Sequence, residues 1–405
     1  MKMKLGINSE IGTLKQVVVK RPGRELENLT PQFLHELLFD DIPFLPAIQK
    51  EHDFFVNVLR ENGAEVFYLE NLLEEAILAS DTRAIFIRDT VKEAGQFGEN
   101  AQHLESFLND FETAELIQKV MTGLRKTEVP KRRLARLDEM LEHRDPFYLA
   151  PLPNLYFTRD PAAVIGNGLS INQMSQPARK RESYFMKFIA THHPAFFKEN
   201  APIWFDRDNR YALEGGDEIV LSEKAIAVGI SERTDPRAIQ MLATNLFQKH
   251  QGIRQVIAFE LPKERAFMHL DTVFTMVAKN QFIVHPSVIS SELKLFIMEW
   301  DKRLADIKIT TSSNIKAVLS EALNEPEIDL IPCGGSDPIN SDREQWNDGA
   351  NTLAIKPGEV VTYNRNQVSN ELLKRHGIKV HEIISSELSR GRGGPRCMTM
   401  PLYRT

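Results

Sequence analysis

The clearest nucleophile in this chain stands in a glycine-rich segment near its C-terminus. Residues 391–400 read Gly-Arg-Gly-Gly-Pro-Arg-Cys-Met-Thr-Met, so Cys397 follows a flexible stretch that carries Arg392 and Arg396. Neighbouring cations favour the thiolate over the thiol, and the thiolate is the reactive form of cysteine. The plain alternative is a buried, inert cysteine. The two arginines favour a reactive Cys397.

Two further segments supply a histidine and carboxylates. In residues 268–274, Met-His-Leu-Asp-Thr-Val-Phe, we expect a strand that places His269 and Asp271 on one face. In residues 213–217, Leu-Glu-Gly-Gly-Asp, two glycines beside Glu214 allow a close backbone approach, and the apolar residues 219–221 predict a following strand. A structural histidine and an ordinary tight turn are the plain alternatives.

The last two segments are a carboxylate before a proline and a polar turn. Residues 157–161 read Phe-Thr-Arg-Asp-Pro, and a residue before proline favours an extended or turn conformation. We therefore expect Asp160 to project from the end of a strand. Residues 347–351, Asn-Asp-Gly-Ala-Asn, precede an apolar run and are interpreted mainly as a structural turn.

Together these groups indicate covalent catalysis on a cationic substrate. A cysteine, a histidine and a glutamate can act as nucleophile, acid or base, and orienting group. The two remaining aspartates do not suit acyl transfer, which needs hydrogen-bond donors around a developing oxyanion. Carboxylates suit a planar cation with several N–H donors, and guanidinium offers five of them in a fixed fork.

These segments, in this order, make the sequence resemble the bacterial arginine deiminases, members of the pentein superfamily, over essentially its whole length. The matching motifs are residues 157–160, 213–217, 268–271 and 392–398. The resemblance implies an α/β fold, a five-bladed pseudosymmetric propeller of ββαβ modules with an inserted all-helical domain. It also implies a hydrolase that converts L-arginine to L-citrulline and ammonia through a thiouronium intermediate, the first step of arginine catabolism by this route.

The resemblance also implies a role for each site residue. Cys397 would be the nucleophile and His269 the general acid and then the base. Glu214 would orient His269, while Asp160 and Asp271 would hold the guanidinium group. The residues implied to bind the rest of the substrate are Asn154, Arg179, Arg233 and Arg392 at its amino-acid end, with Phe157 packed on its side chain. The chain has Pro395-Arg396 where some relatives carry Gly-His.

The segments between the motifs predict alternating strands and helices. Residues 14–20 and 65–69 predict strands, and residues 46–62 predict a helix that ends before Gly63. Residues 72–146 are rich in helix-forming residues, with apolar spacings of three and four as in 106–111 and 133–141. We expect a helical insertion at 72–146 within a catalytic domain of residues 1–71 and 147–405.

A weak internal repeat accompanies this pattern. Residues 59–66 and 373–380 share a helix end, a glycine and a strand at the same spacing, and residues 247–256 are a looser third copy. Any helix-to-strand connection can produce this pattern, so it is compatible with pseudosymmetry without establishing it.

Composition limits the other classes of function. The chain has a net charge of -6, and its basic cluster at residues 131–136 stands among acidic neighbours, which argues against a nucleic-acid partner. No apolar run approaches the roughly 20 residues that a membrane span needs. Two cysteines fit a reducing compartment better than a disulfide framework. We expect a cytoplasmic enzyme, a homo-oligomer (dimer or tetramer), that acts on L-arginine with no cofactor, metal or membrane partner.

Three alternatives remain open at this stage. The nearest are an amidinotransferase or a dimethylarginine hydrolase, which use the same Cys-His chemistry. A metal-dependent ureohydrolase could use His285 with the four site residues at 160, 214, 269 and 271, although these lack the close spacing of binuclear sites. A non-catalytic arginine-binding surface protein would not need the Cys-His-Glu set.

Overall fold

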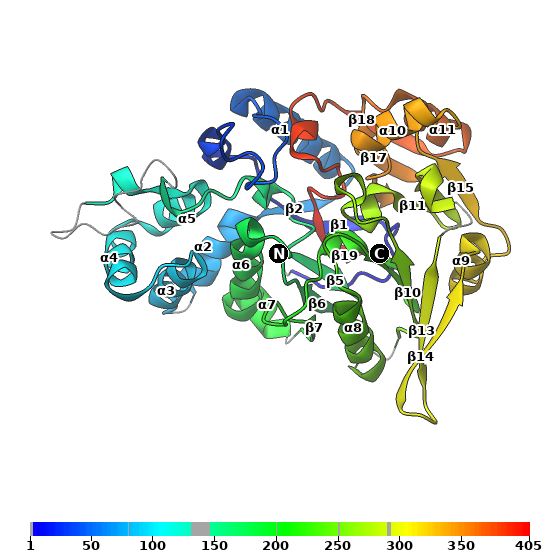
Figure 1. Ribbon diagram of the computed structural model, residues 1–405, viewed down its shortest axis with the longest axis horizontal. Coiled ribbons are helices and arrows are strands. Elements are labelled where there is room, and N and C mark those ends of the chain that lie inside the picture. The colour runs from blue at the N-terminus through cyan, green and yellow to red at the C-terminus, as the bar shows by residue number, and fades with distance from the viewer. Residues whose placement is uncertain (1–2, 80, 131–145, 200, 250–251, 290–292) are drawn as a thin grey trace.

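The computed structural model has a mixed α/β architecture (Figure 1). It describes residues 3–79, 81–130, 146–199, 201–249, 252–289 and 293–405. The basic cluster at 131–136 and the helix expected at 133–141 lie outside the described residues.

Five units of three strands make up most of the described chain. In each unit the first two strands pair antiparallel, and the third strand pairs parallel to the second. The strands, unit by unit, are β5 (Ala162–Ile165), β6 (Gly168–Ile171) and β7 (Ile203–Phe205); β8 (Glu218–Ser222), β9 (Ala225–Ile230) and β10 (Gln255–Glu260); β11 (Phe274–Ala278), β12 (Gln281–Val284) and β15 (Asp329–Pro332); β16 (Leu353–Lys356), β17 (Glu359–Tyr363) and β18 (Lys379–Ile383); and β19 (Met400–Arg404), β1 (Leu14–Val19) and β2 (Glu65–Tyr68).

A helix joins the second strand of each unit to the third, because parallel neighbours need a crossover connection. These helices are α1 (Leu45–Glu61), α6 (Lys180–His192), α8 (Pro236–Lys249), α9 (Ile315–Leu323) and α11 (Gln367–Arg375). In the described residues, α7 (Pro194–Glu199) follows α6 in the same connection, and α10 (Pro338–Trp346) lies between β15 and β16.

The internal repeat follows from this recurrence. Gly63 and Gly377, with φ of 87° and 83°, follow α1 and α11 and lead into the third strand of their units. Glycine takes a positive φ without the steric cost that a Cβ would bring. The looser copy at 247–256 lies at the same place in its unit, between α8 and β10, although residues 250–251 are outside the described residues.

The second unit carries an extension. Strand β10 also pairs antiparallel with β13 (Leu295–Asp301), which forms a hairpin with β14 (Asp306–Ser312). The hairpin reaches away from the rest of the molecule, at the lower right of Figure 1.

In the described residues, the left side of Figure 1 consists mainly of helices, with α2 beside α6 and the others farther out: α2 (Leu69–Leu78), α3 (Arg83–Glu93), α4 (Gly98–Asn109) and α5 (Thr113–Thr122). Leu69 begins α2, so the strand expected at 65–69 is one residue too long. The segment is also not wholly helical, because β3 (Leu124–Arg125) pairs antiparallel with β4 (Phe147–Leu149).

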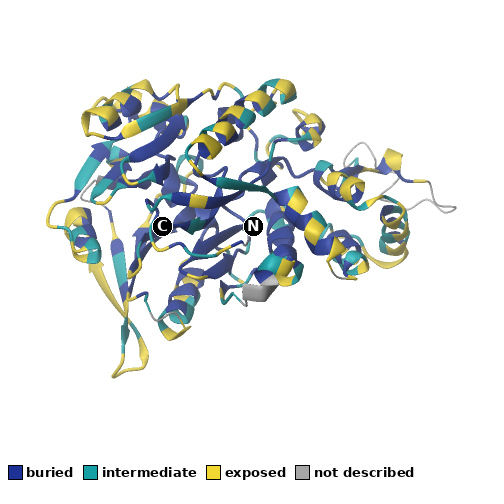
Figure 2. Cartoon of the chain, turned by 180° about the vertical axis from the view of Figure 1, so that it is seen from behind, coloured by how far each residue is buried: buried dark blue, intermediate teal, exposed yellow. Residues whose placement is uncertain are grey.

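The helices α2–α5 share a core with the neighbouring strands. Buried Leu72 and Phe86 belong to the same apolar cluster as Ile165 and Trp204. Figure 2 shows the strands of the units buried and the outer faces of the helices exposed. Within the part of the chain that is described, no helix combines the length and the apolar character that a bilayer span requires.

Candidate active site

The turn before the first strand of each unit carries a side chain that points to one centre. The residues in these turns are Asp160 before β5, Glu214 before β8, His269 and Asp271 before β11, Asn351 before β16, and Cys397 before β19. Residues far apart in the sequence therefore meet, because the same topological position recurs five times. Asp160 lies in a turn, one of the two conformations that its proline neighbour favours, but it precedes β5 and does not project from the end of a strand.

The strand expected at residues 268–274 is wrong in its first half. His269 precedes a short 3-10 turn, η8 (Leu270–Thr272), and β11 begins only at Phe274. The Leu270 N–H donates to Asp217 Oδ1 at 2.8 Å, and Thr272 Oγ1 donates to the His269 carbonyl at 2.6 Å. These bonds stabilise the turn in place of a strand ladder, and both His269 and Asp271 still reach the site.

The candidate site is a small cavity. Eight of the ten expected site residues line it: Asn154, Phe157, Asp160, Arg179, Arg233, His269, Arg392 and Cys397. The other two, Glu214 and Asp271, lie directly behind, bonded to His269 and adjacent to the Cys397 sulfur respectively. The lining also includes Met268, Thr272 and Gly391, which stand in the motif segments but were not expected as site residues, and Leu38 and Arg265, which lie outside those segments.

His269 is held between carboxylates. Its Nε2 lies 2.8 Å from Glu214 Oε2, and its Nδ1 lies 3.8 Å from Asp160 Oδ1. Burial disfavours the imidazolium, but the negative charges of Asp160, Glu214 and Asp217 outweigh burial and raise the pKa of His269 well above its usual range. The His269 bond and neighbouring arginines lower the pKa of Glu214 despite its burial. The pair is therefore imidazolium and carboxylate at neutral pH.

Gly216 makes room for this histidine. A Cβ on Gly216 would lie 2.6 Å from His269 Nδ1 and 2.9 Å from Asp160 Oδ1. The second glycine of the 213–217 motif is thus required by close approach to the imidazole.

Cys397 is buried in an acidic setting. Its Sγ lies 3.6 Å from Asp271 Oδ2. Burial raises the pKa of the Cys397 thiol well above its usual range, Asp271 and Asp160 raise it further, and Arg396 only partly opposes them. Arg396 is itself paired with Glu10 and Asp271, at 2.9 and 2.7 Å. Arg396 therefore does not offset burial and the acidic neighbours, and a further cation in the cavity would favour ionisation of Cys397.

The two aspartates present matching free oxygens. Asp160 Oδ2 accepts from Arg179 Nη1 at 2.6 Å, and Asp271 Oδ2 accepts from Arg396 Nη1 at 2.7 Å. Among the described residues, Oδ1 of each aspartate is buried and has no hydrogen-bond partner. A buried carboxylate oxygen without a donor is costly, so both atoms are available to N–H groups of a ligand.

In the described part of the chain, four arginines line the cavity, and the three that the sequence predicted differ in their contacts. Arg179 pairs with both Asp160 and Glu182, so it is already saturated with carboxylates. Within the described residues, Arg233 Nε and both Nε and Nη1 of Arg392 are buried without a hydrogen-bond partner. The Arg392 guanidinium stacks on the Trp346 ring, 3.3 Å from its centroid. Arg233 and Arg392 therefore have donors for an anionic group, as does Nε of Arg265, although Arg233 Nε also lies 3.5 Å from Glu232 Oε1.

A metal ion could in principle use three of these residues. Single ligand atoms of Asp160, Glu214 and His269 all lie within 4.8 Å of one another. An imidazolium has no lone pair for a metal, however, and the raised pKa of His269 keeps it in that form. His285 lies apart, with Nδ1 2.7 Å from Ser287 Oγ. The donor set fits acid–base chemistry better than metal ligation.

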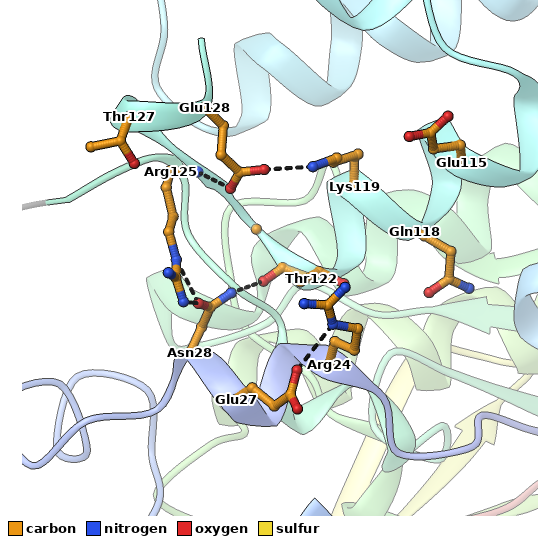
Figure 3. Close-up of a pocket in the computed structure, with 11 residues that line it drawn as sticks. Arg24, Glu27, Asn28, Glu115, Gln118, Lys119, Thr122, Arg125, Thr127 and Glu128 are labelled. Atoms are coloured by element: carbon orange, nitrogen blue, oxygen red, sulfur yellow. Dashed lines mark hydrogen bonds and ion pairs between the residues drawn. The ribbon is translucent and has the colours of Figure 1, made fainter.

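A larger cavity of about 510 Å³ lies elsewhere, between residues 24–28 and the α5 region (Figure 3). Four of its charged groups form two ion pairs: Arg24 Nε with Glu27 Oε2 at 3.0 Å, and Lys119 with Glu128. It holds none of the expected site residues. The larger volume of this cavity therefore does not mark it as the candidate active site.

Asn351 is the contact that sequence reasoning missed. Its Nδ2 lies 3.1 Å from Cys397 Sγ. The signal was present in residues 347–351, which were interpreted as a turn. Only the recurrence of site residues before each first strand marks that turn as part of the site.

Comparison with known proteins identifies the family to which this chain is similar. A family model described as arginine deiminase matches residues 35–404. An arginine deiminase of Listeria monocytogenes (serotype 4a, strain HCC23) is 56% identical over 404 residues, covering 100% of this chain and 98% of the relative. An arginine deiminase of Bacillus cereus (strain B4264) is 54% identical over 408 residues, covering 100% and 99%.

Solved structures with low sequence identity share the fold. The dimethylarginine dimethylaminohydrolase (DDAH) of Pseudomonas aeruginosa, in a complex with citrulline, is 13% identical with a TM-score of 0.52, over 96% of this chain and 99% of that chain. The N-terminal domain of ArgZ, covalently bound to a reaction intermediate, is 12% identical with a TM-score of 0.54, over 96% and 98%.

Proposed function

The chain belongs to the arginine deiminase family, and from that premise we propose how its residues release ammonia from L-arginine. Family membership makes it a hydrolase that acts on a C–N bond of the guanidino group, with L-arginine as substrate. This assignment sets aside the amidinotransferase, the dimethylarginine hydrolase, the metal-dependent ureohydrolase and the non-catalytic alternatives. The roles of individual residues are the proposal.

The substrate guanidinium takes the place between the free Oδ1 atoms of Asp160 and Asp271. Two carboxylates hold the planar cation and align its carbon with Cys397 Sγ. The substrate also brings the positive charge that the cavity otherwise lacks. This charge lowers the pKa of the Cys397 thiol at the moment of binding, and the thiolate forms only when its target is in place.

The chemical steps use His269 twice. The thiolate attacks the guanidinium carbon, and His269 as imidazolium gives its proton to the departing amino group, which leaves as ammonia. The neutral imidazole then takes a proton from water, whose oxygen attacks the thiouronium carbon. The C–S bond breaks, and the hydroxyl proton of the tetrahedral intermediate goes to the sulfur, which restores the thiol whose proton was released to solvent when the substrate bound. Citrulline leaves, and Glu214 stabilises the imidazolium that is formed again. The ArgZ domain bound to a covalent intermediate, which shares this fold, supports an adduct of this kind.

The amino-acid end of the substrate is bound at the opposite side of the cavity. Arg233 and Arg392 have unused donors for the α-carboxylate, and Asn154 and Phe157 line the same cavity. Arg179 contributes through its ion pair with Asp160, and it contacts the carboxylate only if that pair rearranges. The observation that carries the proposal is the pair of partnerless aspartate oxygens beside a cysteine and an imidazolium.

At the level of the whole chain, we propose that the five units surround this site as a five-bladed α/β propeller. Pairing of β19 with β1 would close the ring. We propose residues 72–146 as an inserted domain in a catalytic domain of residues 1–71 and 147–405. A cytoplasmic homo-oligomer, a dimer or a tetramer, remains our expectation, and two buried free cysteines are compatible with that compartment.

The test is citrulline formation from L-arginine by the purified protein and by Cys397→Ser. The serine variant keeps the shape but replaces the thiol with a far less acidic hydroxyl, so it should bind arginine without turnover. Cys333→Ser is the matched control, because Cys333 is equally buried but lies beside Ser369, with its Sγ 3.5 Å from Ser369 Oγ. Full activity of Cys397→Ser, or loss of activity only in Cys333→Ser, would refute the assignment of the nucleophile.

A further inference from the structure

We propose that Asn351 is a positioning residue for the nucleophile, holding Cys397 through two hydrogen bonds and donating one of them to the reacting sulfur. This inference rests on Cys397 being the nucleophile, as proposed above. It assigns a function to a turn that the sequence motifs leave without one.

The recurrence of the units supports this assignment. In four units the turn before the first strand supplies Asp160, Glu214, the His269–Asp271 pair or Cys397. In the remaining unit the equivalent turn lies between α10 and β16, and Asn351 stands two residues before Leu353 begins the strand. Asn351 therefore occupies the same topological position as the residues that carry the chemistry.

The contacts show what its amide does there. Asn351 Nδ2 donates to Cys397 Sγ at 3.1 Å and, more weakly, to the Asp271 carbonyl at 3.3 Å. Asn351 Oδ1 accepts the Cys397 backbone N–H at 3.1 Å. A backbone N–H can only donate, so the amide oxygen must face it, and the NH₂ group must face the sulfur. The orientation of the amide is thus fixed by chemistry.

The side chain is fixed from several sides. Asn351 is fully buried, and its N–H donates to the Asp348 carbonyl at 3.0 Å. Thr275 Oγ1 donates to the neighbouring Ala350 carbonyl at 2.7 Å. On the other side, a Cβ on Gly394 would lie within 2.8 Å of Asn351 atoms, so this glycine lets the loop before Cys397 pack directly on the amide. A side chain held this firmly can position the sulfur.

The electrostatic consequence is specific to the thiolate. Asp271 also contacts the sulfur, and its negative charge opposes ionisation. An N–H donor stabilises a thiolate more than a thiol, because the thiolate is the stronger acceptor. Asn351 therefore offsets part of the acidic setting without adding a charge that would repel a cationic substrate.

A purely structural asparagine predicts a different outcome. If Asn351 only stabilised the loop, its replacement would change stability but not the ionisation of Cys397. The experiment therefore measures the rate of Cys397 alkylation by iodoacetamide against pH, in a Cys333→Ser background, with the modified peptide quantified by mass spectrometry. Turnover of L-arginine is measured on the same preparations.

Asn351→Asp is nearly isosteric but replaces the donor with an acceptor that becomes negatively charged. The midpoint of alkylation should move upward by roughly one to three pH units. The kcat should fall on the order of a hundredfold, as for loss of one donor at a reacting centre, while KM changes little. Asn351→Ala removes the donor without adding a charge, so it should shift the alkylation midpoint in the same direction by a smaller amount. This variant replaces Asn351→Asp in the experiment if the aspartate variant does not fold.

Asn370→Asp is the matched control, since Asn370 is also buried and donates to a backbone carbonyl, that of Tyr363. It should leave the alkylation midpoint unchanged. An unchanged midpoint in folded Asn351→Asp or Asn351→Ala would overturn the inference, whatever happens to stability. If alkylation of Cys397 in the parent leaves citrulline formation intact, the nucleophile assignment itself fails instead.

Discussion

The imidazole of His269 lies between carboxylates that keep it protonated, and this charge determines the pH range of the reaction. A general acid must carry its proton when ammonia leaves, so turnover should decline as pH rises through the raised pKa of His269. Glu214→Gln removes a carboxylate that raises this pKa. The alkaline limb of kcat should therefore move to lower pH, and kcat should fall by about tenfold to a thousandfold.

The measurement is a pH profile of kcat for both proteins, with arginine at saturation. His269→Gln in the same assay should have no alkaline limb of this origin. If the alkaline limb of kcat lies at the same pH in Glu214→Gln as in the wild type, a group other than His269 determines that limb.

The unused donors of Arg233 and Arg392 predict strong selection for the α-carboxylate. Agmatine, which is arginine without that carboxylate, would leave these donors without an anionic partner from the substrate in a poorly solvated cavity. The loss in kcat/KM should be roughly 30-fold to several thousandfold, as for an unpaired buried charge. Comparable turnover of agmatine and arginine would assign these arginines a different role.

The acid–base assignment of Asp160, Glu214 and His269 also predicts independence from metal ions. Prolonged treatment with a strong chelator should leave citrulline production unchanged. Activity that is lost on treatment and returns with a divalent cation would instead make these three residues ligands.

At the scale of the elements, the site depends on how closely the turns before the strands can approach one another. Gly216→Ala would place a Cβ 2.6 Å from His269 Nδ1 and displace the imidazole. A displacement of about 1 Å at a reacting group costs on the order of a hundredfold in rate, and we expect a loss of that size in kcat.

Gly63→Ala is the comparison for this variant. Gly63 has a φ of 87°, and no other group lies within 4 Å of the position that a Cβ would take there. Alanine at this position should therefore cost about 1 kcal/mol of stability, from the positive φ alone, and leave kcat unchanged. Equal kcat for Gly216→Ala and the wild-type chain would show that the close approach to His269 is not needed for catalysis.

The local elements were largely predictable from sequence where propensity and burial agree. The β-branched run of β1 and the helix α1 with its glycine stop were confirmed to within a residue. The segment at 268–274 was not, because a side chain distant in sequence, Asp217, accepts the Leu270 N–H and favours a 3-10 turn. Alternation along one strand carries no information about such a partner.

Some features of the candidate site were also predictable from the sequence, and others were not. Resemblance identified ten residues that the structure brings to one cavity or directly behind it. It did not reveal that Arg179 is already paired with Asp160 and Glu182, nor that Asn351 contacts the sulfur. Both depend on distances between units, which a linear motif does not contain.

At the scale of the whole molecule, the pairing of β19 with β1 joins the two ends of the chain in one sheet. Leu402 of β19 is fully buried in the apolar cluster that spans the strands and α2–α5. Leu402→Ala should lower the free energy of unfolding by about 2–5 kcal/mol, as for other buried leucines. Activity and circular dichroism should be lost at the same denaturant concentration, because Cys397 stands just before this strand.

Leu304→Ala, at the tip of the β13–β14 hairpin with 73% of its side chain exposed, should change stability by no more than about 0.5 kcal/mol. Urea titration of both variants makes the comparison. An equal effect of the two substitutions would mean that the closing strand is not a stabilising element.

The position of Cys397 directly before β19 also determines when the site is completed during protein synthesis. A ribosome adds this residue after every other group of the site. The strand β19 follows Cys397 in the chain, whereas its pairing partner β1 precedes the other site residues. A growing chain can therefore assemble the carboxylates and His269 while it still lacks the nucleophile. Catalysis should begin only after β19 has been made and has paired with β1, and a nascent chain that lacks β19 should consume no arginine.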